Sequence, residues 1–208
     1  MKNVLLIGDS IRLGYQSRLQ ELLGENVTVY APKENCRFTK YALWGMFSWY
    51  DGFGRPKIDA AQWNSGIWDI HRVTADGQLF TPIDEYEEYQ RRMVVQMRSY
   101  TDKVIFANST PGGKALDAQH PINPLVNTES GFGKVPLTAR MDEWNADIKR
   151  YNERAEKVMK EMNVPVNDFY SAIMADTEKY VCADGVHMTP EGYDLLAHMA
   201  AEKILELL

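Results

Sequence analysis

The sequence predicts an α/β fold, a three-layer α/β/α sandwich built around a five-stranded parallel sheet. Short apolar runs rich in Val and Ile alternate with longer stretches of helical periodicity, which is typical of successive strand–helix units. The chain has 208 residues, 45% of them hydrophobic, which is enough for one well-packed core and short for two. We therefore predict a single domain that covers residues 1–208.

The first strand is predicted at residues 2–7, where an apolar run precedes Gly8. That run is too short for the apolar region of an export signal, so we interpret it as a buried strand. Similar apolar runs and helical spacings predict the elements that follow. The further strands are expected at residues 27–30, 58–61, 103–107 and 164–166, and the helices at 15–23, 38–50, 85–100 and 141–162.

The C-terminal part carries the clearest local signals. In residues 141–162 apolar side chains recur at steps of three and four, which marks one buried helix face. A last helix is expected after Thr189, which can cap its first turn, with Pro190 at the first helical position. Residues 108–140 are rich in Gly, Pro, Asn, Ser and Thr, which predicts a long loop. This loop is either a lid or substrate-binding element, or a surface insertion without a role.

Charge and composition exclude several classes of function. The net charge is -6, the sequence pI is near 5.3, and no Lys/Arg run could follow a phosphate backbone, so nucleic acid is not an expected partner. No apolar stretch is long enough to span a bilayer, and we expect a soluble protein with the cytoplasm as its default location, unless an export signal was removed. The two cysteines, Cys36 and Cys182, allow at most one disulfide. A monomer or a dimer is expected.

Neither a metal nor a cofactor is expected. His71, His120 and His198 have no metal-ligand spacing with a second His or Cys. His198 lies on the last predicted helix, where a surface or packing role is expected. His120 lies in the predicted long loop and would reach a cleft only if that loop is a lid.

Gly8-Asp9-Ser10 follows the first predicted strand and opens onto a helix. Ser10 is therefore expected at the carboxyl edge of the sheet, where ligand crevices form in open α/β folds. Glycine permits a tight exit from the strand, and a helix amino terminus favours developing negative charge. Alone, the tripeptide is also typical of an ordinary strand-to-helix turn.

Asp184-Gly185-Val186-His187 stands near the other end of the chain, just before the last predicted helix. In a turn, this spacing lets the carboxylate accept a hydrogen bond from one imidazole nitrogen, so that the other nitrogen can take a proton from a serine. A serine nucleophile needs such a base at neutral pH. The two segments together predict a Ser10–His187–Asp184 triad.

At these residues the chain resembles the SGNH/GDSL hydrolases, which place Gly-Asp-Ser after the first strand and Asp-x-x-His before the last helix. The resemblance implies the flavodoxin-like SGNH hydrolase fold and ester hydrolysis through an acyl-enzyme, without metal or cofactor. The matching segments are Gly8-Asp9-Ser10-Ile11-Arg12-Leu13-Gly14 and Asp184-Gly185-Val186-His187, the latter followed by Thr189-Pro190-Glu191-Gly192-Tyr193.

The same resemblance implies an oxyanion hole with three donors. They are the N–H of Ser10, the N–H of a glycine after the second strand, and an asparagine side chain after the third. Asn64, just past the predicted strand 58–61, fits the asparagine, although the family more often has Gly-x-Asn-Asp there. No glycine follows strand 27–30 before Gly45. The second N–H can come from Asn35 or Cys36, and we predict Cys36, which lies just before a predicted helix.

The substrate is expected to be a small-molecule ester. Arg12 and Arg37 could hold a substrate carboxylate in bidentate fashion, with ion pairs to Glu34 or Asp69 as their alternative role. Further predicted substrate contacts are Asp9, Trp63 and Trp68.

The middle third of the sequence is rich in aromatic residues. Such residues can stack on sugar rings or line an acyl pocket, and for Trp44 and Trp49 the alternative is that they pack in the core. We expect deacetylation of a carbohydrate or of another small O-acyl ester. Lipase- or thioesterase-type hydrolysis is an alternative, and so is a non-catalytic flavodoxin-like binding domain, which would not need Asp184 and His187. The aromatic residues concerned are Trp44, Trp49, Tyr50, Phe53, Trp63 and Trp68.

Overall fold

The computed structural model describes residues 1–74, 76–114 and 141–208. Its centre is one five-stranded sheet in which every pairing is parallel and the strand order is β2-β1-β3-β4-β5. The predicted α/β fold is confirmed. The strands are β1 (Lys2–Ile7), β2 (Val27–Tyr30), β3 (Ala60–Asn64), β4 (Val104–Ala107) and β5 (Val166–Asn167).

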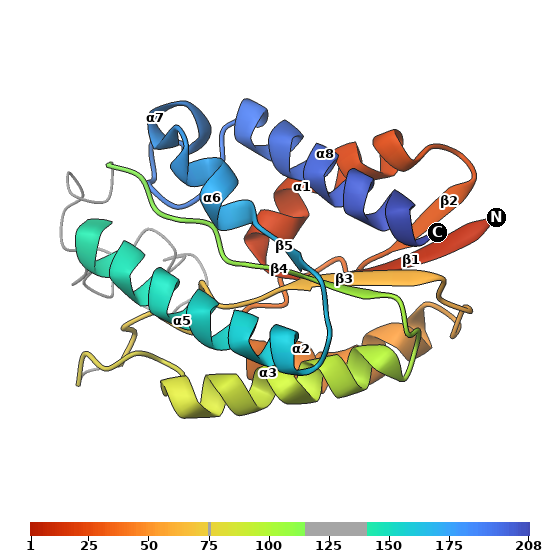
Figure 1. Cartoon of the computed structure of the whole chain (residues 1–208), viewed down its shortest axis with the longest axis horizontal. Coiled ribbons are helices and arrows are strands. Elements are labelled where there is room, and N and C mark those ends of the chain that lie inside the picture. The colour runs from red at the N-terminus through yellow and green to blue at the C-terminus, as the bar shows by residue number, and fades with distance from the viewer. Residues whose placement is uncertain (75, 115–140) are drawn as a thin grey trace.

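Helices cover both faces of the sheet (Figure 1). On one side, α1 packs against α8, with α6 and α7 beside α8; on the other side lie α2, α3 and α5. The helices are α1 (Ser10–Leu23), α2 (Thr39–Gly52), α3 (Ile83–Arg98), α5 (Met141–Glu161), α6 (Phe169–Met174), α7 (Thr177–Tyr180) and α8 (Pro190–Leu207).

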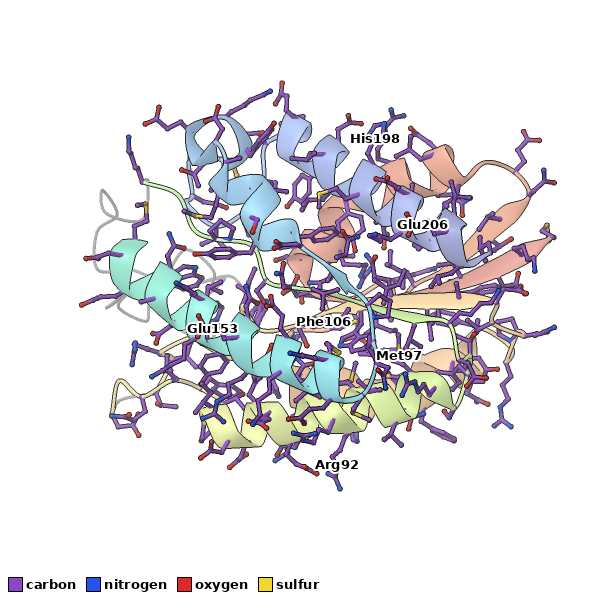
Figure 2. All side chains as sticks on the ribbon, in the orientation of Figure 1. Arg92, Met97, Phe106, Glu153, His198 and Glu206 are labelled. Atoms are coloured by element: carbon purple, nitrogen blue, oxygen red, sulfur yellow. The ribbon has the colours of Figure 1, made fainter. Side chains whose placement is uncertain are left out.

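The core lies between the sheet and these two helix layers. β3 and β4 are buried along their whole length, as sheet strands covered on both faces are. Figure 2 shows Phe106 of β4 inside the molecule, whereas Arg92 of α3 and His198 of α8 point to solvent. Of the two positions expected for His198, surface or packed interior, the structure shows the surface.

Several element bounds differ from the prediction by one or two residues, and those of α1 and β3 differ most. Helix α1 begins at Ser10 and not at residue 15, because the Asp9 side chain accepts from the N–H of Ile11 at 3.0 Å and caps the helix at once. Strand β3 covers residues 60–64 and not 58–61. Its polar Gln62 is buried because it donates to the hydroxyl of Tyr15 at 3.0 Å and accepts from Asn167 at 3.3 Å.

The predicted loop 108–140 lies mostly outside the described residues, and so does His120. Its described part, residues 108–114, has no helix or strand. In that part, the N–H of Gly112 donates to Asn145 of α5 at 2.7 Å. Among the described residues, no helix is long and apolar enough to cross a membrane.

Candidate active site

Ser10 is the first residue of α1 and follows the end of β1 by three positions. The N–H groups in the first turn of a helix have no intrahelical acceptor, so they favour negative charge beside Ser10. Gly8 lets the side chain of Asn64 approach the backbone closely, because a Cβ at this position would collide with that side chain. In Gly8-Asp9-Ser10, the glycine therefore allows Asn64 to approach closely, the aspartate caps α1, and the serine supplies a partly exposed hydroxyl.

Asp184 and His187 lie in a tight turn that closes just before α8. The turn is bounded by an antiparallel bridge between Val181 and Met188, and the N–H of Cys182 donates to the carbonyl of His187 at 2.8 Å. Gly185 has a φ of 79°, a left-handed conformation that favours glycine. Helix α8 packs on α1, and His187 of the turn contacts Ser10 at the start of α1.

The three side chains form a continuous hydrogen-bonded series. The Nε2 atom of His187 lies 3.0 Å from the Oγ atom of Ser10, and its Nδ1 atom lies 2.5 Å from Oδ2 of Asp184. A carboxylate only accepts, so Nδ1 carries the proton and Nε2 is left to accept from the serine. The other oxygen of Asp184 accepts from the N–H groups of Val186 and His187, both at 2.9 Å.

These contacts set the charges of the acid and the base. Burial raises the pKa of Asp184, but hydrogen bonds from the His187 ring and from two backbone N–H groups outweigh it and hold that pKa below its ordinary 3.8. The hydrogen bond to Asp184 raises the pKa of His187 above 6.5, although burial opposes it. Asp184 therefore stays ionised wherever His187 can act as a base.

Asn64 is the last residue of β3 and lies beside Gly8 at the same edge. Its Nδ2 atom donates to Oδ1 of Asp9 at 2.9 Å, and the same oxygen accepts from Ile11. Both side chains are buried, and burial raises the pKa of Asp9. This contact uses one of the two N–H groups of the Asn64 amide, and the other has no partner among the described residues.

A profile of the GDSL-like lipase/acylhydrolase family matches residues 71–200, which is more than half of the chain. The chain belongs to this family. The match includes Asp184 and His187, whereas Ser10 precedes it. No curated protein matches the sequence.

Several solved structures of acylhydrolases and esterases have the same fold. A lipase/acylhydrolase from Enterococcus faecalis superposes with a TM-score of 0.73 at 20% identity, covering 98% of this chain and 95% of that chain. For a GDSL-like lipase from Bacteroides thetaiotaomicron the values are 0.70 and 18%, with coverage of 100% and 89%. For an acetylxylan esterase from Geobacillus stearothermophilus they are 0.66 and 15%, with coverage of 98% and 94%.

One predicted oxyanion donor of this GDSL-like chain is wrong. The N–H of Cys36 donates to the carbonyl of Gly8 at 3.1 Å, so it points at the backbone and not at a ligand. The next N–H, that of Arg37, donates to the side chain of Asn35 at 2.8 Å. Burial raises the pKa of the Cys36 thiol, which also argues against a reactive cysteine.

Three predicted substrate contacts are also wrong. Arg12 is fully buried, and its guanidinium donates to the backbone carbonyls of Gly8, Pro32 and Glu34 at 3.1, 2.8 and 2.6 Å. It therefore joins the end of β1 to the loop after β2. It is not placed to make the predicted substrate contact, and it forms no ion pair with a residue that the structure describes. Trp63 is in the core and donates to Gln90 of α3, and Asp9 is buried behind Ser10.

The other predicted contacts remain predictions. Arg37 is exposed and lies over the ring of Tyr41, 5.2 Å from its centre, and Trp68 is half-buried beside His71. Trp44 is 73% exposed, so the alternative that it packs in the core is wrong. Among the described residues, no group of three or more His, Cys, Asp or Glu side chains is arranged to hold a metal ion.

The sequence prediction missed the polar residues that follow β4. The amide of Asn108 donates to Glu156 at 2.9 Å and to Asp168 at 2.8 Å, and the N–H of Ser109 donates to Asn152 at 2.9 Å. These bonds fix the loop after β4 against α5 and against the end of β5. The available signal was a polar run directly after a buried strand, at the edge that carries Ser10.

Proposed function

We propose that this chain is a serine esterase that cleaves carboxylic esters by two-step acyl transfer. The observation that carries the proposal is the hydrogen-bonded series from Ser10 through His187 to Asp184, which spans 177 positions of sequence between serine and histidine. A non-catalytic domain of the same fold would have no need to hold an imidazole between a carboxylate and a serine hydroxyl. Membership of the GDSL-like family supports the proposal.

In the first step, the Oγ atom of Ser10 attacks the ester carbonyl while its proton passes to Nε2 of His187. The imidazolium is stabilised by Asp184, which stays ionised, and it then gives the proton to the leaving alcohol. In the second step, a water molecule is deprotonated by His187 and attacks the acyl-enzyme. The acid product leaves and Ser10 regains its proton.

The tetrahedral oxyanion needs donors on the side of the carbonyl away from His187. We assign the N–H of Ser10, in the first turn of α1, and the amide N–H of Asn64 that does not bind Asp9. Two donors are fewer than the resemblance implies. Each well-placed donor lowers the activation barrier by about 3–4 kcal/mol, so Asn64 supplies a large part of the stabilisation of the oxyanion.

The substrate that we propose is a small O-acyl ester, in particular an O-acetylated carbohydrate. The acetylxylan esterase from Geobacillus stearothermophilus, which has the same fold, supports this substrate class. Half-buried Trp68 supplies an aromatic face for a sugar ring.

The proposal is tested with a fluorophosphonate label and with p-nitrophenyl acetate. We expect the wild-type protein to label once and to hydrolyse the ester, and Ser10→Ala to do neither. The Cys36→Ala protein is the matched control, because its thiol is buried beside the site, and it should label like the wild type. An unlabelled and inactive wild type, or an active Ser10→Ala protein, would refute the nucleophile and favour a binding domain. Acetylated sugars and long-chain p-nitrophenyl esters then separate a carbohydrate esterase from a lipase.

A further inference from the structure

Aromatic rings follow one another from the edge of the sheet onto the outer face of α2. We call Phe80, Phe38, Tyr41, Trp44 and Trp49 the aromatic row. The ring centres of Phe80 and Phe38 lie 4.8 Å apart, and those of Phe38 and Tyr41 lie 5.9 Å apart. Tyr41 in turn lies 5.8 Å from Trp44 and 6.0 Å from Trp49.

One carboxylate holds two rings of the row in place. The hydroxyl of Tyr41 donates to Oε2 of Glu34 at 2.7 Å, and Nε1 of Trp49 donates to Oε1 at 2.9 Å. Trp49 reaches back along the helix over Gly45, where any Cβ would collide with its indole. The backbone carbonyl of Glu34 accepts from buried Arg12 at 2.6 Å. Tyr41 and Trp49 are therefore held in place before any ligand arrives, so binding does not have to order these two rings.

The aromatic row is continuous with the edge that carries Ser10. The loop between β2 and α2 leads into the row, and the N–H of Cys36 in this loop donates to the carbonyl of Gly8, two residues before Ser10. Phe38 is the N-cap of α2, and helices that follow parallel strands begin at the carboxyl edge of the sheet. Trp44 lies five residues into α2, about 8 Å along its axis from that edge.

The exposure of the row points to a ligand with both apolar and hydroxyl groups. Trp44 is 73% and Phe80 40% exposed, which the core does not require. Hydrogen bonds from Tyr41 and Trp49 lower the pKa of Glu34, so an ionised, exposed carboxylate stands among the rings. Sugar rings present C–H faces that stack on aromatic rings and hydroxyls that donate to a carboxylate. An anionic lipid surface fits less well, because the chain carries a net charge of -6.

We propose that the aromatic row binds the sugar residues next to the acylated one, so that the enzyme acts on acylated oligo- or polysaccharides in preference to single sugars. The inference rests on the proposed esterase function. It assigns the row a part in binding the carbohydrate and no part in the bond-breaking step.

The test compares acetylated xylo-oligosaccharides with p-nitrophenyl acetate, which is too small to reach from Ser10 to Trp44. We expect Trp44→Ala to lower the ratio of the two kcat/KM values about fivefold, mostly through KM for the oligosaccharide. Phe47→Ala is the matched control, because Phe47 lies on the same helix, is 72% exposed and is outside the row. It should leave both substrates unchanged. Titrating Ser10→Ala protein with unacetylated xylo-oligosaccharide, followed by calorimetry, should show binding that Trp44→Ala weakens.

The possible failures are distinguishable. If the wild type hydrolyses neither ester, the proposed function fails. If it hydrolyses p-nitrophenyl acetate but the Trp44→Ala and Phe47→Ala proteins have equal substrate ratios, the function survives and the row is not a sugar site. Loss of a dimer in sedimentation, or loss of binding to phosphatidylglycerol vesicles, on Trp44→Ala alone with an unchanged substrate ratio would assign the row to a second copy or to a lipid surface, and would overturn the inference.

Discussion

Two buried oxygens beside Ser10 accept no hydrogen bond within the described structure: Oδ2 of Asp9 and Oδ1 of Asn64. Such atoms cost free energy, about 1–3 kcal/mol for a neutral group, which the rest of the fold must offset. The one bond that joins the two side chains, from Nδ2 of Asn64 to Oδ1 of Asp9, fixes the amide plane. It thereby aims the second amide N–H. We therefore propose that Asp9 is a positioning residue that acts through Asn64.

This role predicts a graded response at residue 9. Asp9→Ala should lower kcat on p-nitrophenyl acetate by about 10–100-fold with little change in KM, because Asn64 loses its anchor in the transition state. Asp9→Asn should recover most of the loss, since an amide oxygen still accepts from Asn64 and Ile11. Burial raises the pKa of Asp9, which makes an uncharged replacement a close match. Steady-state kinetics check this, and equal losses in both variants would contradict a positioning role.

At the scale of single elements, the sequence predicted strands and helices well where apolar periodicity dominates, as in α5 and α8. It failed where tertiary contacts decide. The predicted strand ends at residue 61, before polar Gln62, yet Gln62 lies inside β3, where it forms hydrogen bonds with Tyr15 and Asn167. Cys36 occupies the place expected of the second oxyanion donor, and only coordinates show that its N–H binds Gly8. None of these partners is near in sequence, so no local sequence pattern indicates these contacts.

Helices α3 and α5 are joined by Glu87, which accepts from Arg154 at 2.6 Å and from Lys157 at 3.2 Å, both on α5. Its side chain is 14% exposed. The hydrogen bond from Arg154 lowers the pKa of Glu87 to about 2 from 4.5, although burial opposes it. The stabilisation is therefore present above about pH 4.5 and is lost as pH falls through about 2.

Glu87→Gln should lower the free energy of unfolding on the order of 1 kcal/mol at neutral pH, and by less as the pH falls toward about 2. Urea titrations across this range measure it. Glu88→Gln is a matched control on the same helix, since Glu88 is exposed and has a longer contact, 3.6 Å, to Arg92. If the two variants lose the same stability at neutral pH, the link between α3 and α5 contributes nothing.

At the scale of the whole molecule, parallel topology gathers the site. All five strands end at one edge, so the turn after β1, the loop after β2 and the end of β3 meet there although long helices separate them in sequence. The packing of α8 on α1 brings the Asp184–His187 turn to Ser10. That Ser10, His187 and Asp184 lie together was predictable, because their positions follow from the fold class. The aromatic row was not, because it depends on how side chains lie on α2.

The same edge contains a buried carboxylate that makes global stability depend on pH. Asp69 is fully buried and accepts from the N–H of Thr39 at 3.0 Å and from its hydroxyl at 2.8 Å, which ties the loop after β3 to α2. Burial raises the pKa of Asp69 to about 6 from 3.8, and hydrogen bonds from Thr81 and Thr39 only partly oppose it. Between these two pH values the folded chain keeps a proton that the unfolded chain releases.

The free energy of unfolding should therefore fall as pH rises from about 4 to about 6, by on the order of 2–3 kcal/mol from Asp69 alone. Asp69→Asn should remove this decline while keeping an acceptor for Thr39. Measured by denaturant titration, the variant should gain stability relative to wild type between about pH 4 and about pH 7. Asp51→Asn on the surface of α2 is the control and should show no such gain. A constant difference between Asp69→Asn and wild type across this range would contradict the prediction, because it would mean that the pKa of Asp69 is the same in the folded and the unfolded chain.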